Sequence, residues 1–159
     1  MAASLSRGWF ILFAVVLILF RTMKKTKPER NKNPFSLIQK NPDKWIGLTG
    51  SDAKGFLSFD TVTHGVRAGF INLFNRYYLR GLDTIEKIFP VYAPPFENDT
   101  EAYIRAVCKW TGFTPDKVLD VYDFYALGSA IIKMEAGKNW VSEKDFKNGF
   151  TRARKKLSL

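Results

Sequence analysis

Helix start and stop signals follow one another from Asp60 to the end of this 159-residue chain, and they constrain its fold more than any other feature. Apolar residues recur at three- and four-residue spacing, with capping residues or glycines at the ends of the periodic stretches. The predicted helices are 63–80, 84–89 ended by Pro90, 100–111, one opened by Thr114-Pro115, one from Asp120 or Asp123 to Gly137, and one from Ser142 to 152–156. This pattern predicts a mainly α-helical fold.

Polar residues suited to capping stand before these helices and fix where they should begin. The expected N-cap residues are Asp60, Asp83, Asp99 or Asn98, and Ser142, the last in a capping box with Asp145. Gly81 and Gly112 are placed to end the first and third helices.

Turn-forming residues dominate the stretch between 33 and 55. Two short extended segments, Trp45–Leu48 and Phe56–Phe59, can pair as a hairpin across the Gly50–Gly55 connection. We therefore predict one β-hairpin near the start of the helical domain, as the only sheet.

The front of the chain carries an unbroken apolar run from Trp9 to Phe20, bounded by Arg7 and Arg21. Twelve residues rise about 18 Å as a helix, less than a hydrocarbon core of about 30 Å, but flanking arginines can reach the interface. A cleaved signal peptide has a similar length, yet no small-residue cleavage site follows the run. We favour an uncleaved single-pass membrane anchor over 1–21, a basic tether over 22–33 and a domain over 34–159.

The charge balance suits polyanionic partners. The chain has 25 Lys and Arg against 15 Asp and Glu, a net charge of +10, which favours nucleic acid, anionic lipid or acidic cell-wall polymer. Cys108 and His64 are the only residues of their types, so we expect no metal site and no cofactor, and an inert core thiol at Cys108.

Residues 93–104 place a carboxylate in a stiff loop before a helix start. Pro94 and Pro95 fix the backbone of this loop, and Glu97 follows them directly. Such a loop can aim a proton donor at a substrate. The structural alternative is an acid that satisfies the dipole and amides of the next helix.

Several local patterns, taken in order and at their spacing, resemble the structural proteins of corticovirus-type, membrane-containing icosahedral bacteriophages. The resemblance covers roughly residues 33–136, and its most specific run is 92–104. The patterns are Asn33-Pro34, Trp45-x-Gly47, Gly55-Phe56-x-x-Phe59-Asp60, His64-Gly65-Val66-Arg67-Ala68, Tyr78-x-x-Gly81-x-x-Thr84-Ile85, and Tyr92-Ala93-Pro94-Pro95-x-Glu97-Asn98-x-Thr100-x-x-Tyr103-Ile104. The family implies a virion protein with a lysozyme-like, peptidoglycan-degrading helical domain.

Two departures from that family bear on chemistry. The family's Asn-Pro-Gly-Asn-Ile-Arg is Asn-Pro-Phe-Ser-Leu-Ile at 33–38, so any substrate contact there is altered. Lysozyme-like enzymes carry the acid glutamate at a helix end before the hairpin. The upstream glutamate here is Glu29, which we expect to be solvated in the tether.

Glu97 is therefore the predicted general acid, because Pro94, Pro95 and Phe96 can raise its pKa by desolvation. A transglycosylase needs one such acid, whereas a hydrolase needs a second carboxylate about 5–9.5 Å away, for which Asp60 is the first candidate. The candidate substrate-binding residues are Asn98, Thr100, Tyr103 and Thr84 by hydrogen bonding, and Trp45 and Tyr78 by stacking. Aromatic residues at this spacing also suit a core, and Arg67 is expected to bond a carboxylate or a carbonyl.

The sequence thus favours a virion-associated, membrane-anchored peptidoglycan glycosidase, either a muramidase or a lytic transglycosylase. It would act when the phage genome enters the cell or when progeny are released. The expected partners are peptidoglycan, phage or bacterial membrane lipid and other virion proteins, with non-specific DNA contact through the basic residues. The alternative is a non-catalytic virion protein that links the internal membrane to capsid or genome.

Overall fold

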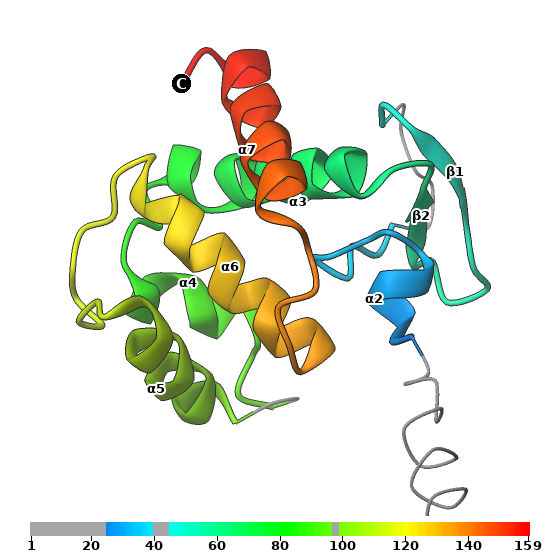
Figure 1. The fold of residues 1–159 in the computed structure, drawn as a ribbon. Coiled ribbons are helices and arrows are strands. Elements are labelled where there is room, and N and C mark those ends of the chain that lie inside the picture. The colour runs from blue at the N-terminus through cyan, green and yellow to red at the C-terminus, as the bar shows by residue number, and fades with distance from the viewer. Residues whose placement is uncertain (1–24, 40–44, 97–98) are drawn as a thin grey trace, which may run out of the picture.

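A computed structural model describes residues 25–39, 45–96 and 99–159 (Figure 1). The elements in this part of the chain are α2 Lys27–Arg30, β1 Leu48–Ser51, β2 Leu57–Phe59, α3 Val62–Arg76, a 3₁₀ turn Tyr78–Arg80, α4 Ile85–Tyr92, α5 Thr100–Thr111, α6 Asp123–Ala136 and α7 Glu143–Leu157. The prediction of a mainly helical fold with one β-hairpin is confirmed.

The core forms around α3, and α7 packs against this helix (Figure 1). Phe70 of α3 lies at the centre and is fully buried. Its ring contacts Phe35, Phe146 and Phe150 edge-on, at centroid distances of 5.2, 5.3 and 4.9 Å. One aromatic residue therefore joins the N-terminal segment to the last helix.

Two glycines allow the backbones to approach closely. A Cβ on Gly65 of α3 would lie 1.9 Å from the Lys32 carbonyl oxygen, so only glycine lets the N-terminal segment lie on this helix. A Cβ on Gly149 of α7 would lie 2.4 Å from the Val66 side chain. The packing of 31–35 and of α7 on α3 thus depends on these two positions.

The hairpin lies beside α2 on one side of the molecule, with α4 and α5 on the opposite side (Figure 1). β1 and β2 are antiparallel, with Leu48 opposite Phe59 and an irregular register before Gly50. The buried side chains of β2 form a small second core with Ala68 and the partly buried Trp45. The predicted strand at Trp45–Leu48 in fact begins at Leu48, so that prediction was three residues early.

Asn33 connects the N-terminal segment to the hairpin. It is 1% exposed, and its amide nitrogen donates to the carbonyls of Leu37 and Leu57, both at 3.0 Å. Its side-chain oxygen accepts from the Leu37 amide at 2.9 Å. The Asn33-Pro34 pattern is therefore a structural junction.

The predicted ends of several helices agree with the structure. Asp99 caps α5 by accepting from the Ala102 amide at 2.9 Å, and Gly112 ends that helix with φ of 74°. Ser142 caps α7, accepting from the Asp145 amide at 3.1 Å. Gly137 follows α6 with φ of 72°.

Other helix predictions were wrong. Thr61 rather than Asp60 caps α3, and Thr84 rather than Asp83 caps α4, because each threonine hydroxyl accepts from the third amide of its helix. α4 continues through the exposed Pro90 to Tyr92, since the proline removes a single hydrogen bond two residues from the helix end.

Thr114-Pro115 begins only a turn. The segment after it is held against the start of α4 instead: the Pro115 carbonyl accepts from the Glu86 amide at 3.0 Å, and the Leu119 amide donates to the Asp83 carbonyl at 2.7 Å. These tertiary bonds compete with a local helix.

The described part of the expected tether, 25–33, contains α2 and lies against the domain. Glu29 is not solvated: its side chain is 12% exposed, and an oxygen lies 3.0 Å from the Lys138 ammonium. In the described segments no helix has the length and apolar character needed to cross a bilayer. The predicted anchor over 1–21 lies outside those segments.

Candidate functional site

A cleft of about 430 Å³ opens between the hairpin side of the molecule and the helices. Residues 35–38 and Phe56 form one wall. The other wall consists of residues from four helices or their ends: Asn72, Arg76 and Tyr77 of α3 and its C-cap, Tyr92 and Ala93 at the end of α4, Tyr103 of α5, and Glu135 of α6. Aromatic surface with a few polar groups is the usual lining of a small-molecule or sugar site.

Glu135 and Tyr92 form the chemical centre of this cleft. The Tyr92 hydroxyl donates to a carboxylate oxygen of Glu135 at 2.5 Å. Burial, and then the negative charge of Glu135, hold the pKa of Tyr92 well above its usual value. The tyrosine is therefore a permanent donor that fixes one orientation of the carboxylate.

The sequence analysis missed Glu135 because it lies inside a regular helix, without a turn or proline to mark it. One signal was available: Glu135 follows the fully buried Ile131 by four residues. Positions four apart share a helix face, so this carboxylate lies on the inward face of α6.

Of the predicted site residues at and before the start of α5, one lines the cleft and one is buried in the fold. Tyr103 lines the cleft, and its ring centroid lies 6.3 Å from that of Phe89. Thr100 is buried, and its hydroxyl donates to the Ala93 carbonyl at 2.6 Å, which closes the base of the loop before α5. Glu97 and Asn98 lie outside the described residues.

Three other predicted site residues, Thr84, Trp45 and Tyr78, do not line this cleft, and each makes contacts that support the fold. Thr84 is buried as the N-cap of α4. The Trp45 indole donates to Gln39 at 2.8 Å. The Tyr78 ring packs 5.3 Å from Phe124 in the main core.

Asp60 lies apart from the cleft, at the start of α3. It is exposed, and an oxygen lies 2.6 Å from Nδ1 of His64. This hydrogen bond is the main cause that lowers the pKa of Asp60, so the group is an ionised carboxylate near neutral pH.

Glu29 stands before the hairpin in a helix, where a lysozyme-like fold carries its acid, but its surroundings favour the charged form. The Thr26 amide donates to Glu29 at 2.6 Å and is the main cause that lowers the pKa of the carboxyl, followed by the hydrogen bond from Lys138. A general acid needs the opposite shift. Glu29 is therefore unsuited to that role.

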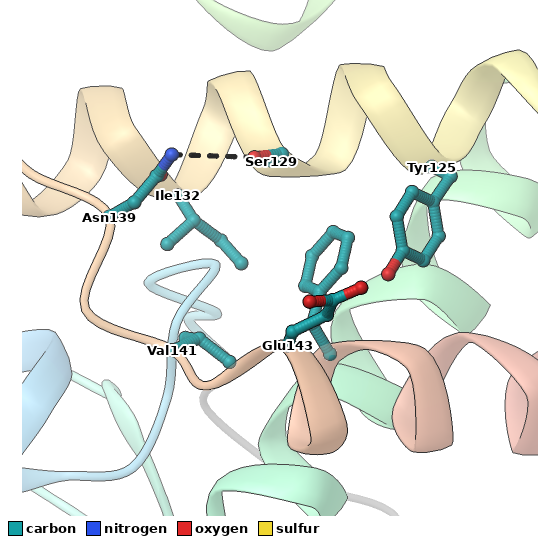
Figure 2. A pocket seen from close by; sticks show the side chains of 7 residues that line it. Tyr125, Ser129, Ile132, Asn139, Val141 and Glu143 are labelled. Atoms are coloured by element: carbon teal, nitrogen blue, oxygen red, sulfur yellow. Dashed lines mark hydrogen bonds between the residues drawn. The ribbon is translucent and has the colours of Figure 1, made fainter.

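A second cavity, of about 260 Å³, lies between α6 and the start of α7 (Figure 2). Figure 2 shows the Glu143 carboxylate facing the Tyr125 hydroxyl, and Asn139 donating to Ser129 at 3.5 Å. Burial and then the charge of Glu143 raise the pKa of Tyr125. This cavity therefore also pairs a carboxylate with a tyrosine, as the cleft does, but its glutamate is exposed.

The fold and the cleft define a small helical protein with one hairpin and a carboxylate-bearing groove beside it. No protein-family model matches the chain. Protein P5 of Pseudoalteromonas phage PM2 is 36% identical over 125 residues, which cover 76% of this chain and 78% of the phage protein. The chain therefore belongs to the family of that phage protein. This relationship confirms the resemblance to corticovirus proteins and supports the virion as its location, with other virion components as partners.

Proposed function

We propose that this virion protein is a membrane-anchored glycosidase that cleaves peptidoglycan in the cleft beside the hairpin. The observation that carries the proposal is the Glu135 carboxylate, held by the Tyr92 hydroxyl at 2.5 Å in a cleft of about 430 Å³. The membrane anchor rests on the apolar run from Trp9 to Phe20.

The cleft lining suits a glycan strand. Sugar rings present hydroxyls at their edges and apolar C–H faces, so a sugar site combines polar groups with aromatic surface. Asn72 and Arg76 supply hydrogen-bond donors on one wall, and Tyr103 and Phe56 supply aromatic surface.

Two carboxylates take different roles in this proposal. Glu97 remains the proposed general acid, because it follows Pro94-Pro95 in the sequence between α4 and α5. The hydrogen bond from Thr100 to the Ala93 carbonyl joins the two ends of this connection. Glu135 replaces Asp60 as the second carboxylate, since Asp60 does not line the cleft. Glu135 would activate the attacking water or face the positive charge that develops on the sugar ring.

Digestion of purified peptidoglycan by the full chain in detergent, followed by mass spectrometry of the fragments, tests the proposal. We expect Glu97→Gln and Glu135→Gln each to lower the cleavage rate at least about a hundredfold. The matched control is Glu143→Gln, which changes the carboxylate of the second cavity and should leave the rate within about twofold. Reducing ends would identify a hydrolase and anhydro ends a transglycosylase.

A non-catalytic virion protein is the second candidate, and the structural roles of Thr84, Trp45 and Tyr78 favour it, because these residues of the family patterns serve the fold. Release of no fragments by the folded wild-type protein would reject the glycosidase in favour of this candidate. Loss of cleavage in Glu143→Gln with full activity in Glu135→Gln would move the site to the second cavity.

A further inference from the structure

A third concave site lies between the start of α3 and the end of α7, away from the cleft. Its volume is about 440 Å³, and its lining is Ile46, His64, Arg67, Arg152, Lys155 and Lys156. No carboxylate lines this groove in the part of the chain that the structure describes. Asp60 adjoins this groove, since one of its carboxylate oxygens lies 2.6 Å from Nδ1 of the lining residue His64.

Arg67 is the central residue of this basic groove. It is 8% exposed, yet in the described segments its guanidinium makes no ion pair and no hydrogen bond, contrary to the sequence-based expectation of a carboxylate or carbonyl partner. The guanidinium reaches solvent through the groove, but most of the residue is withdrawn from water, and a charge so placed is costly unless an opposite charge faces it. The unpartnered guanidinium lines the groove and therefore points to an anionic ligand.

The fold brings further cations to the same place. Because Gly149 lets α7 approach Val66 and the Arg67 backbone amide, the next turn of α7 sets Arg152 beside Arg67. Burial, and then the like charge of the neighbouring Arg152, lower the pKa of Arg67. Lys155 and Lys156 add two more positive charges at the groove.

We propose that this basic groove binds the phosphodiester backbone of nucleic acid without reading its sequence. A guanidinium group can donate two parallel hydrogen bonds to two oxygens of one phosphate, whereas a lysine ammonium attracts phosphate as a point charge. Insertion into a lipid surface needs a broad apolar face, and the groove has one exposed apolar side chain, Ile46, so we commit to nucleic acid and make lipid phosphate an outcome of the test. The inference is independent of the proposed glycosidase, because none of these residues lines the cleft.

Net charge alone gives some DNA binding, so the test must separate the groove from the rest of the surface. We would measure binding of the full chain in detergent to a labelled random-sequence DNA duplex by fluorescence anisotropy, over a range of salt concentrations. The groove variants are Arg67→Gln and the double variant Arg152→Gln/Lys155→Gln, whose residues are exposed and spare the core. The charge-matched controls are Arg105→Gln and Arg105→Gln/Lys109→Gln on the exposed surface of α5.

We expect each groove variant to bind DNA at least about tenfold more weakly than its control, with the slope of log K against log salt falling by about 1 for each charge removed. Circular dichroism checks the fold of Arg67→Gln, and the double variant carries the test if that protein unfolds. Equal weakening by groove and control variants overturns the proposal. So does a larger effect of the groove variants on phosphatidylglycerol vesicles than on DNA, which would assign the groove to lipid phosphate.

Discussion

The Lys138 ammonium lies 3.0 Å from the Glu29 carboxylate, so the turn after α6 holds the short helix that precedes the whole domain. Glu29 also accepts from the amide and the hydroxyl of Thr26, at 2.6 and 3.0 Å. One carboxylate thus completes the capping box of α2 and fastens that helix to the helical body.

This arrangement predicts a pH-dependent contribution to stability. The folded-state pKa of Glu29 lies below its ordinary value of 4.5, so its stabilising effect is complete above that pH and is lost as pH falls through the folded-state pKa. We expect Glu29→Gln to lower the free energy of unfolding by about 1 kcal/mol at pH 7 and by much less at pH 3. Urea unfolding at both pH values measures this difference, with the exposed Glu101→Gln as control. A difference that stays constant with pH would contradict it.

The close approach at Gly65 predicts a larger effect. In Gly65→Ala the new methyl group would meet the Lys32 carbonyl oxygen at 1.9 Å, and backbone cannot move aside as a flexible side chain can. We expect a loss of about 1–3 kcal/mol in unfolding free energy and faster amide exchange in 31–37. Asn75→Ala, on the exposed side of the same helix, is the control, and equal stability of the two variants would disprove the effect.

The central position of Phe70 predicts the largest loss in the core. Phe70→Ala removes three edge-on aromatic contacts and leaves a cavity between α3 and α7, at an expected cost of about 3–5 kcal/mol. Phe96, which is 83% exposed, is the matched control, and Phe96→Ala should change stability by less than about 0.5 kcal/mol. Thermal unfolding of both variants measures the contrast. A small loss in Phe70→Ala would mean that the helices repack around the gap.

If the cleft is catalytic, Tyr92→Phe should lower kcat more than it changes KM. The ring still packs 5.5 Å from Phe89, but Glu135 loses the hydroxyl that orients it. We expect kcat on peptidoglycan fragments to fall about ten- to a hundredfold, because small misplacements of a reacting group have effects of this size. Tyr125→Phe in the second cavity should leave kcat unchanged. A normal kcat in Tyr92→Phe would remove this hydrogen bond from the mechanism.

Local sequence signals were sufficient to predict helix ends that depend only on neighbouring residues. The cap and stop of α5, from Asp99 to Gly112, and the start of α7 at Ser142 depend on residues three or four positions apart, which the sequence displays directly. The helix predicted at Thr114-Pro115 failed because its backbone bonds to α4, and no local pattern contains that partner.

The functional residues likewise divide into those that the sequence indicated and those that only the tertiary structure showed. Patterns along the chain singled out Tyr103 in the cleft and led to the phage family, because those features are linear. The contacts of Glu135 and Lys138 and the position of Arg67 beside Arg152 could not be read from the chain, since each depends on a residue distant in sequence. Sequence by itself indicated most of the longer helices and the family to which the chain belongs. Only the tertiary structure decided which charges meet, because the energy of a buried charge depends on what surrounds it in space.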